Sequence, residues 1–400
     1  MHTTRQPDEN RRPRLTPAIA DVRRAVRDLL HSELLRVENS GDRYPASANP
    51  AQDDRDVDRS PEFSASGTGT GTGTGTKTGT RTETGTGRGN DSDSATLVLV
   101  ALSGGPDSLA LAAATAFEAP RAGIRAGAVI VDHGLQQGSA DVAAGTADTA
   151  RALGLSPVLV KSVTVGAEGG PEAAARAARY TALAAAASET RAAMILLGHT
   201  LDDQAETVLL GLARGSGATS LHGMAASSAS LAGAIYGRPL LGIRRATTHQ
   251  FCVDAGLEPW HDPQNDDEAF ARVRVRRTVL PLLERELGPG IAEALARTAE
   301  QLREDSDALD HFAEEMAEDI ADLAESGISL SVRSLASNPP ALRQRLIRLA
   351  VGSEFHVSLS RAHTLEVARL VTDWHGQKPL DLPGIRVERQ GGLLIFTTNE

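Results

Sequence analysis

The chain has 400 residues, a formal net charge of −11 and only 3% aromatic residues. A chain of this length can form two or three domains with a sizeable buried core. Its single cysteine, Cys252, excludes a disulfide framework and any zinc or iron–sulfur site built from several thiolates. No stretch approaches the roughly 20 apolar residues of a membrane span, and the N-terminus lacks an apolar signal segment. We therefore expect a cytoplasmic protein with no membrane partner.

The acidic balance argues against a nucleic-acid partner, but the arginines are clustered along the chain. Residues 272–277 read RVRVRR, and residues 343–348 hold three more arginines. Local basic surfaces can bind phosphates even within an acidic protein. Composition alone therefore leaves RNA binding open.

The N-terminal region, residues 1–38, is expected to contain one helix. A long polar insert, residues 39–95, is expected to follow it. Apolar residues recur at helical spacing over residues 15–36, and Thr16 before Pro17 is a typical N-cap with proline at the first helical position. Residues 39–95 are polar and contain a run of Gly-Thr repeats. They offer too little apolar surface to offset chain entropy, so we expect a disordered insert.

Residues 96–285 alternate between short apolar segments and helical ones, which predicts a doubly wound α/β domain with a parallel sheet. The expected strands are residues 97–102, 127–131, 157–160, 194–197 and 238–241. The expected helices are residues 107–117, 141–153, 172–190 and 202–213. Ligands of such sheets bind at the carboxyl ends of the strands, where the distinctive polar residues of this chain fall.

Residues 286–400 are expected to form a second, mainly helical C-terminal domain. The helical patterns cover residues 290–323, 340–349 and 360–372, and a small β element is predicted over residues 379–397.

A polar loop follows the first strand and opens the next helix; it consists of Ser103, Gly104, Gly105, Pro106, Asp107 and Ser108. The glycines leave backbone amides uncovered, the helix N-terminus adds partial positive charge, and the serines supply hydroxyl donors. This combination predicts a site for a polyphosphate such as ATP. A carboxylate repels phosphate, so Asp107 is expected to act through Mg²⁺. A tight turn with a polar helix cap is the simpler alternative.

The Ser-Gly-Gly-Pro-Asp-Ser loop after an apolar strand resembles the signature of the PP-loop ATP pyrophosphatases. That resemblance implies an adenine nucleotide alpha hydrolase-like fold and cleavage of ATP to AMP and pyrophosphate. Residues 197–224 are similar to the GHxxDDxxET…RGSG…L.GM block of tRNA(Ile)-lysidine synthases. Four further segments resemble other blocks of that family: residues 131–136, 172–180, 239–252 and 261–284. The insert is not part of the family pattern.

The resemblance implies a ligase that forms a C–N bond between free L-lysine and the 2-position of a cytidine. The cytidine is the wobble base of a tRNA(Ile) with a CAU anticodon, and the product reads AUA instead of AUG. Transfer of AMP to the carbonyl oxygen makes a good leaving group, and the lysine amine then attacks.

The resemblance also implies roles for individual side chains. Asp107, Asp203, Glu206 and Arg176 would be catalytic, and Asp203 and Glu206 would bind lysine through its ammonium groups. Asp132, His133 and His199 would join the loop in binding ATP. The tRNA would be contacted by Arg214 and by Arg272, Arg274 and Arg276, which share one face if their segment is extended. Each residue also has a plainer interpretation, such as an acidic helix N-terminus or a surface ion pair.

Three alternative functions stay open at this stage. A PP-loop tRNA thiolase typically needs several cysteines, and the single Cys252 argues against it. A small-molecule amide synthetase would lack the RGSG block, and a non-catalytic RNA-binding protein would not need the acidic residues. The sequence does not reveal the oligomeric state, and a homodimer is one alternative.

Overall fold

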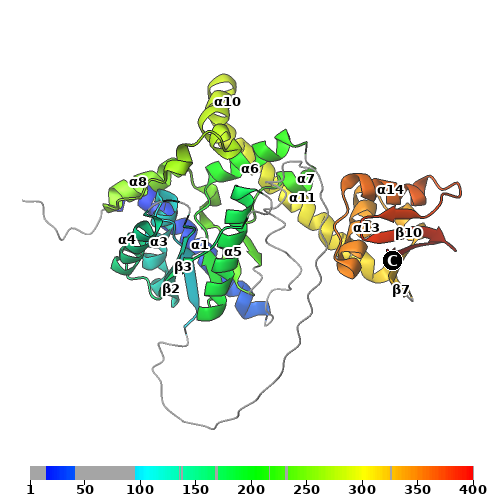
Figure 1. Ribbon diagram of the computed structural model, residues 1–400, viewed down its shortest axis with the longest axis horizontal. Helices are drawn as coiled ribbons and strands as arrows, with labels where there is room; N and C mark the ends of the chain where they lie inside the picture. The colour runs from blue at the N-terminus through cyan, green and yellow to red at the C-terminus, as the bar shows by residue number, and fades with distance from the viewer. Residues whose placement is uncertain are drawn as a thin grey trace, which may run out of the picture. The chain divides into compact units, whose positions relative to one another are not determined.

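The computed structural model describes residues 15–40, 95–134, 136, 138–166, 170–215, 217–229, 233–324 and 327–399. Most of the predicted insert lies outside these residues. The chain divides into two compact units, Met1–Ala299 and Glu300–Glu400, whose elements Figure 1 labels. The division falls inside helix α11 (Ile291–Ile320), whereas the sequence placed a boundary after residue 285.

The first unit is built on a six-stranded sheet with the strand order β3-β2-β1-β4-β6-β5. Every neighbouring pair is parallel except β5 and β6. The strands are β1 (Leu97–Ala101), β2 (Arg125–Asp132), β3 (Val158–Ser162), β4 (Met194–Leu196), β5 (Ser227–Ala229) and β6 (Ile235–Gly237). The predicted parallel sheet is confirmed. The strand predicted over residues 238–241 is wrong, because β6 ends before Arg238 and Pro239–Gly242 forms a 3₁₀ turn, where the missing proline amide is tolerated.

Helices cover both faces of this sheet, as expected for a doubly wound fold (Figure 1). Successive residues of β1 point to opposite faces. Val98 and Val100 pack in the core formed with α1 (Pro17–Ser40), α3 (Pro106–Glu118), α4 (Ser139–Ala152) and α8 (Arg245–Ala255). Leu97 and Leu99 pack in the core that includes Leu183 of α5 (Pro171–Thr190). The expected helix near the N-terminus is confirmed, with Thr16 accepting a bond from the Ile19 amide at 3.4 Å.

Two helix N-termini meet at the carboxyl edge of the sheet. Helix α3 follows β1, and α6 (Leu201–Ala213) follows β4. A Cβ atom at Gly198 would lie 3.1 Å from the Ser108 amide nitrogen. A larger residue at this position would push the end of β4 away from the start of α3 by a few tenths of an ångström. The two polar segments singled out in the sequence are brought together by this approach.

The segment after α8 is helical and not extended. It comprises α9 (Ala271–Arg274), a π-helical segment η5 (Val275–Val279) and α10 (Leu280–Leu287). The condition under which Arg272, Arg274 and Arg276 would share one face, an extended segment, is therefore not met. In a helix, Arg272 and Arg276 are four residues apart and share a side, while Arg274 faces another direction. Val273 and Val275 are buried, and Val275 packs with Leu201 and Ala205 of α6, which favours this helix.

The second unit combines helices with a five-stranded antiparallel sheet of order β7-β8-β11-β10-β9. Its helices are the later part of α11, α12 (Val332–Ser337), α13 (Pro340–Phe355) and α14 (Arg361–Thr372). Its strands are β7 (Ala321–Ala324), β8 (Gly327–Ser331), β9 (Leu380–Leu382), β10 (Ile385–Gln390) and β11 (Leu393–Thr398). The predicted helices and the C-terminal β element are present, and two further strands extend that element. Among the described residues, no helix has the length and apolarity needed to cross a bilayer.

Candidate active site

The loop between β1 and α3 is a compact turn closed by its own serines. The Ser108 hydroxyl accepts a bond from the Ser103 amide at 3.2 Å and donates one to the Gly105 carbonyl at 3.0 Å. Gly104 has a φ of 85°, and a Cβ there would lie 2.8 Å from the Thr146 hydroxyl. Gly105 is the N-cap of α3, and no described side chain caps this helix. The first-turn amides of α3 can therefore serve an anion.

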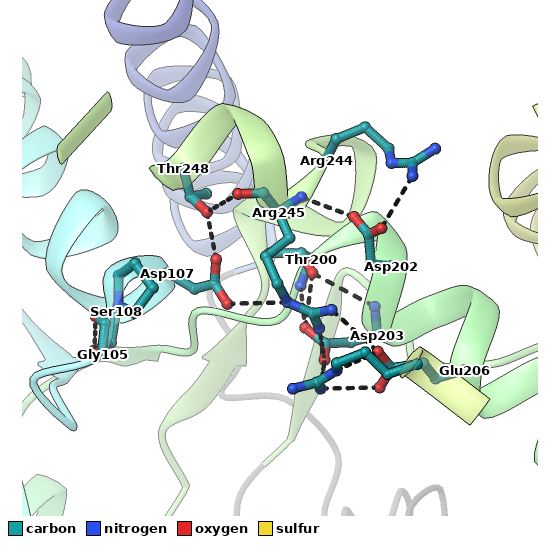
Figure 2. A network of polar contacts seen from close by, with 12 residues as sticks. Gly105, Asp107, Ser108, Thr200, Asp202, Asp203, Glu206, Arg244, Arg245 and Thr248 are labelled. Carbon is teal, nitrogen blue, oxygen red and sulfur yellow. Dashed lines mark hydrogen bonds and ion pairs between the residues drawn. The ribbon is translucent and has the colours of Figure 1, made fainter. Parts of the chain in front are cut away.

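Asp107 points from the first turn of α3 across the sheet edge toward α8 (Figure 2). One carboxylate oxygen accepts a hydrogen bond from the Thr248 hydroxyl, and the other lies 3.6 Å from Nε of Arg245. Burial raises the pKa of Asp107, and the charge of Asp203 adds to this rise, while Thr248 and Arg245 oppose it. The loop of residues 103–108, which we call the nucleotide loop for the role proposed below, is thus linked directly to α8.

Asp203 and Glu206 face the same arginine from the first turns of α6 (Figure 2). Oδ2 of Asp203 accepts bonds from the Thr200 amide and hydroxyl, both at 2.8 Å. Its Oδ1 accepts a bond from Nη2 of Arg245 at 2.7 Å. Oε1 of Glu206 accepts bonds from Arg245 at 3.1 Å and from Arg276 at 2.8 Å. Although burial opposes it, the charges of Arg245 and Arg272 and the hydrogen bond from the Thr200 amide hold the pKa of Asp203 well below its usual range.

These groups form a charge-balanced set that we call the carboxylate cluster; it contains Asp107, Asp203, Glu206, Arg245, Arg272 and Arg276. The Glu206 side chain has no exposed surface, and Nε and Nη2 of Arg276 bind its two oxygens at 2.8 and 3.1 Å. Arg272 donates to the Thr207 hydroxyl at 3.1 Å and lies 3.7 Å from Glu206. Each carboxylate is therefore already paired with a guanidinium.

The charges of three arginines lower the pKa of His199, and we call these residues, Arg176, Arg179 and Arg238, the arginine cluster. Arg238 is 2% exposed and donates to the Ala225 carbonyl at 3.0 Å and the Ser228 hydroxyl at 3.1 Å. Burial lowers the pKa of Arg176 to about 10, and neighbouring arginines add to this effect. Burial and the charge of Arg238 hold the pKa of His199 well below its usual value. His199 is therefore a neutral imidazole.

The remaining predicted residues lie at two other places. Asp132 and His133 end β2, where Asp132 accepts a bond from the Gly134 amide at 3.0 Å. Burial lowers the pKa of His133, and its Nδ1 has no hydrogen-bond partner among the described residues. Arg214 is exposed at the end of α6, and Arg274 is exposed and donates to main-chain carbonyls at 2.7 Å. Neither of these two arginines is part of the carboxylate cluster.

Arg245 and Thr248 are site residues that the sequence analysis did not single out. Both lie in residues 239–252, a segment noted only for its resemblance to a family block. Arg245 is the first residue of a helix of mixed composition, a position usually filled by a solvated side chain. The only signal was the adjacent pair Arg244-Arg245, which does not distinguish a buried guanidinium from a surface one.

A cavity of about 560 Å³ opens beside the carboxylate cluster within the first unit. Its lining includes Glu206, Arg245, His249, Arg276, Leu280 and Glu284. It combines charges of both signs with an apolar wall, which suits a small zwitterion with an aliphatic chain.

Residues 81–283 match a family model described as a PP-loop domain, and residues 330–394 match one described as the TilS substrate binding domain. A tRNA(Ile)-lysidine synthase from Leifsonia xyli subsp. xyli is 68% identical over 296 residues, covering 74% of this chain and 88% of that protein. The chain belongs to the tRNA(Ile)-lysidine synthase family. A tRNA(Ile)-lysidine synthase from Thermobifida fusca is 54% identical over 303 residues, covering 75% of this chain and 91% of that protein.

Among solved structures, the U34-tRNA thiolase NcsA from Methanococcus maripaludis, with its [4Fe-4S] cluster, is 20% identical at a TM-score of 0.44. The match covers 52% of this chain and 73% of the thiolase. A lysidine synthase and a thiolase differ in chemistry, and so distant a likeness does not bear on which one this chain performs.

Proposed function

We propose that this lysidine synthase family member ligates free L-lysine to the 2-position of the wobble cytidine in tRNA(Ile) with a CAU anticodon. ATP is the co-substrate and is converted to AMP and pyrophosphate through an adenylated cytidine. One observation carries the proposal: Arg245 links Asp107 of the nucleotide loop with Asp203 and Glu206. The loop suited to a triphosphate and the carboxylates suited to an amine therefore belong to one site.

The nucleotide loop would bind the triphosphate through the amides at the start of α3 and the serine hydroxyls. Asp132, His133 and His199 are proposed to contact the nucleotide. Asp107 fits Mg²⁺ as a single carboxylate ligand, because Mg²⁺ is usually held by one or two carboxylates together with substrate phosphates. When bound there, Mg²⁺ would neutralise phosphate charge.

Asp203 and Glu206 are the proposed receptor for lysine, since ionised carboxylates bind ammonium groups strongly. Attack on the adenylated carbon needs a neutral amine, so one proton must leave the ammonium as the C–N bond forms. The acceptor is one of these carboxylates or a phosphate oxygen. Arg176 of the arginine cluster would stabilise the phosphate charge or the activated cytidine.

The tRNA would be held by exposed arginines and by the second unit. Arg214 and Arg274 are exposed and suit contacts to phosphates, which position an RNA without reading its sequence. Arg272 and Arg276 face Glu206. In our proposal they hold that carboxylate and contact the tRNA only near the wobble cytidine that is bound in the site. The second unit would provide the main contact to tRNA(Ile).

The test is incorporation of radiolabelled lysine into an unmodified tRNA(Ile) transcript with a CAU anticodon, in the presence of ATP. We expect incorporation to require both ATP and the transcript, and Asp203→Ala to abolish it while tRNA affinity is kept. A transcript with a changed anticodon is the control. Pyrophosphate release with a small amide and no RNA would contradict the proposal and favour an amide synthetase.

A further inference from the structure

Arg245 stands where the proposed function requires the lysine ammonium to bind. Its Nη2 lies 2.7 Å from Asp203 and its Nη1 lies 3.1 Å from Glu206, so one guanidinium bridges both proposed receptor carboxylates (Figure 2). A guanidinium and an ammonium compete for the same carboxylate lone pairs. An incoming lysine therefore meets a receptor that a side chain of the protein already fills.

Charge balance leads to the same conclusion. The carboxylate cluster contains three carboxylates and three guanidiniums, and a lysine zwitterion would add a net positive charge. Placing that charge beside three guanidiniums in a buried site is unfavourable. Lysine binding thus requires that one arginine move away or that negative charge arrive. A bound triphosphate supplies such charge at the neighbouring nucleotide loop.

Arg245 is the arginine of the cluster that lies beside Asp107 of the nucleotide loop. Its backbone amide is held by Oδ2 of Asp202 at 2.7 Å, so its side chain can swing while the start of α8 stays fixed. Its Nε already lies 3.6 Å from Asp107 of the nucleotide loop. Arg276, in contrast, binds both oxygens of Glu206 in a two-point contact. Guanidinium groups also bind phosphates in two-point geometry, so a triphosphate at the loop is a strong competitor for Arg245.

We propose that Arg245 closes the lysine site in the absence of nucleotide and opens it by turning to the triphosphate, so that ATP binds before lysine. This inference rests on the proposed function and adds an order of binding to it. Arg245 then controls the order of binding by pairing with one of two sets of groups. In the closed state it neutralises Asp203 and Glu206, and in the open state it neutralises phosphate oxygens next to Asp107.

The proposal makes the two substrates help each other to bind. By linkage, the factor by which ATP raises the affinity for lysine equals the factor by which lysine raises the affinity for ATP. Couplings between sites commonly amount to about 5- to 150-fold, and we expect at least about 10-fold here. Removal of the Arg245 guanidinium should abolish the coupling, because the lysine site is then open at all times.

The experiment is calorimetric titration of the full-length protein with L-lysine, with and without α,β-methylene-ATP and Mg²⁺. Wild type should bind lysine at least about 10-fold more tightly with the analogue, whereas Arg245→Met should bind it equally well in both conditions. Arg244→Met is the matched control, because Arg244 is adjacent but pairs with Asp202 and Glu293. The control should keep the wild-type dependence. Lysine incorporation at saturating ATP gives a second measurement, in which Arg245→Met should lower kcat and raise the KM for ATP.

Arg245→Lys covers the case in which Arg245→Met fails to fold, as judged by thermal unfolding. It keeps a positive charge and should retain part of the dependence on the analogue. Complete loss of the dependence in Arg245→Lys would overturn the proposal, as would wild type that binds lysine equally with and without the analogue. Wild type that makes no lysidine would overturn the proposed function as well. Wild type that makes lysidine without this coupling would overturn the order of binding alone.

Discussion

The carboxylate cluster and the arginine cluster lie on neighbouring parts of one sheet edge but carry charge in different ways. In the carboxylate cluster every charge has a partner of opposite sign, down to the buried Glu206 and its two-point contact with Arg276. In the arginine cluster Arg238 is bonded to a carbonyl and a hydroxyl, and His199 is kept neutral. In our proposal the first arrangement opens before it binds a cation, and the second contributes positive charge toward an anion.

The difference is consistent with a two-substrate reaction in which the substrates carry opposite charges. A triphosphate or an adenylate finds positive charge already in place around His199. An ammonium finds carboxylates that are held in position but already occupied. The arginine cluster would be arranged for the anion in advance, and the carboxylate cluster would be occupied by Arg245. Together these arrangements would prevent lysine from binding before the nucleotide is present.

A large loss of activity is expected when the carboxylate cluster is broken at Glu206. Glu206→Gln keeps the shape but removes the charge, so lysine loses one ionic contact and Arg276 loses its counter-ion. A hydrogen bond to a charged group is worth about 1.5–3 kcal/mol, so kcat/KM for lysine should fall about 10- to 100-fold. Steady-state lysine incorporation into tRNA measures this loss.

Glu293→Gln is the control for that measurement. Glu293 also pairs with an arginine, Arg244, but at the partly exposed side of the site. Exposed ion pairs contribute little, so lysine kinetics should stay within about two-fold of wild type. Equal losses in the two variants would show that Glu206 acts through general stability and not as part of a receptor.

The fold and the nucleotide loop could be predicted from the sequence, while the pairing of charges could not. Strand β1 is buried on both faces and therefore reads as an unbroken apolar run. The loop of residues 103–108 places two glycines and two serines at the start of a helix, a local composition that favours phosphate binding. Arg245 meets Asp203 across 42 residues, and Arg276 meets Glu206 across 70. Such contacts depend on how helix ends approach one another, which no local pattern records.

The arginine-rich segment after α8 shows the same limit. The alternation of valine and arginine over residues 272–276 is typical of a strand, but tertiary packing makes it a helix. A strand would place Arg272, Arg274 and Arg276 on one face, whereas a helix places Arg272 and Arg276 on one side. Only the helix brings Arg272 and Arg276 to Glu206. The predicted role in tRNA contact was therefore argued from a geometry that the chain does not adopt.

Acidification is expected to have an intermediate effect, on the free energy of unfolding. It tests whether His199 in the arginine cluster is kept neutral. Burial and Arg238 lower the pKa of His199 in the folded state, so below about pH 6.5 the unfolded chain binds a proton that the folded chain does not. Stability is therefore complete above that pH and falls as the pH drops, by up to about 1.4 kcal/mol per pH unit for one proton. Urea unfolding between about pH 7.5 and 5.5 measures the slope.

Two variants assign that slope to His199. His199→Gln should reduce the pH dependence, because one of the groups that take up a proton on unfolding is gone, and the slope that is left belongs in part to His133, whose pKa burial also lowers. Arg238→Met should raise the pKa of His199, seen as a shifted midpoint in an NMR titration of its ring, because a neighbouring positive charge is removed. An unchanged midpoint would show that Arg238 does not act on His199 and would weaken the distinction between the two clusters.

The weakest effect is expected at Cys252, which belongs to neither cluster. It lies in α8 at 1% exposure, its thiol contacts the Pro106 carbonyl at 3.4 Å, and burial raises its pKa to about 11. A thiol of this kind is protonated and inaccessible, so Cys252→Ala should keep lysine incorporation and lose only about 1 kcal/mol of stability from the small cavity. Chemical denaturation and the incorporation assay check both values. Loss of all activity, with the fold intact, would point to sulfur chemistry at this site and would contradict a reaction carried out by carboxylates and arginines.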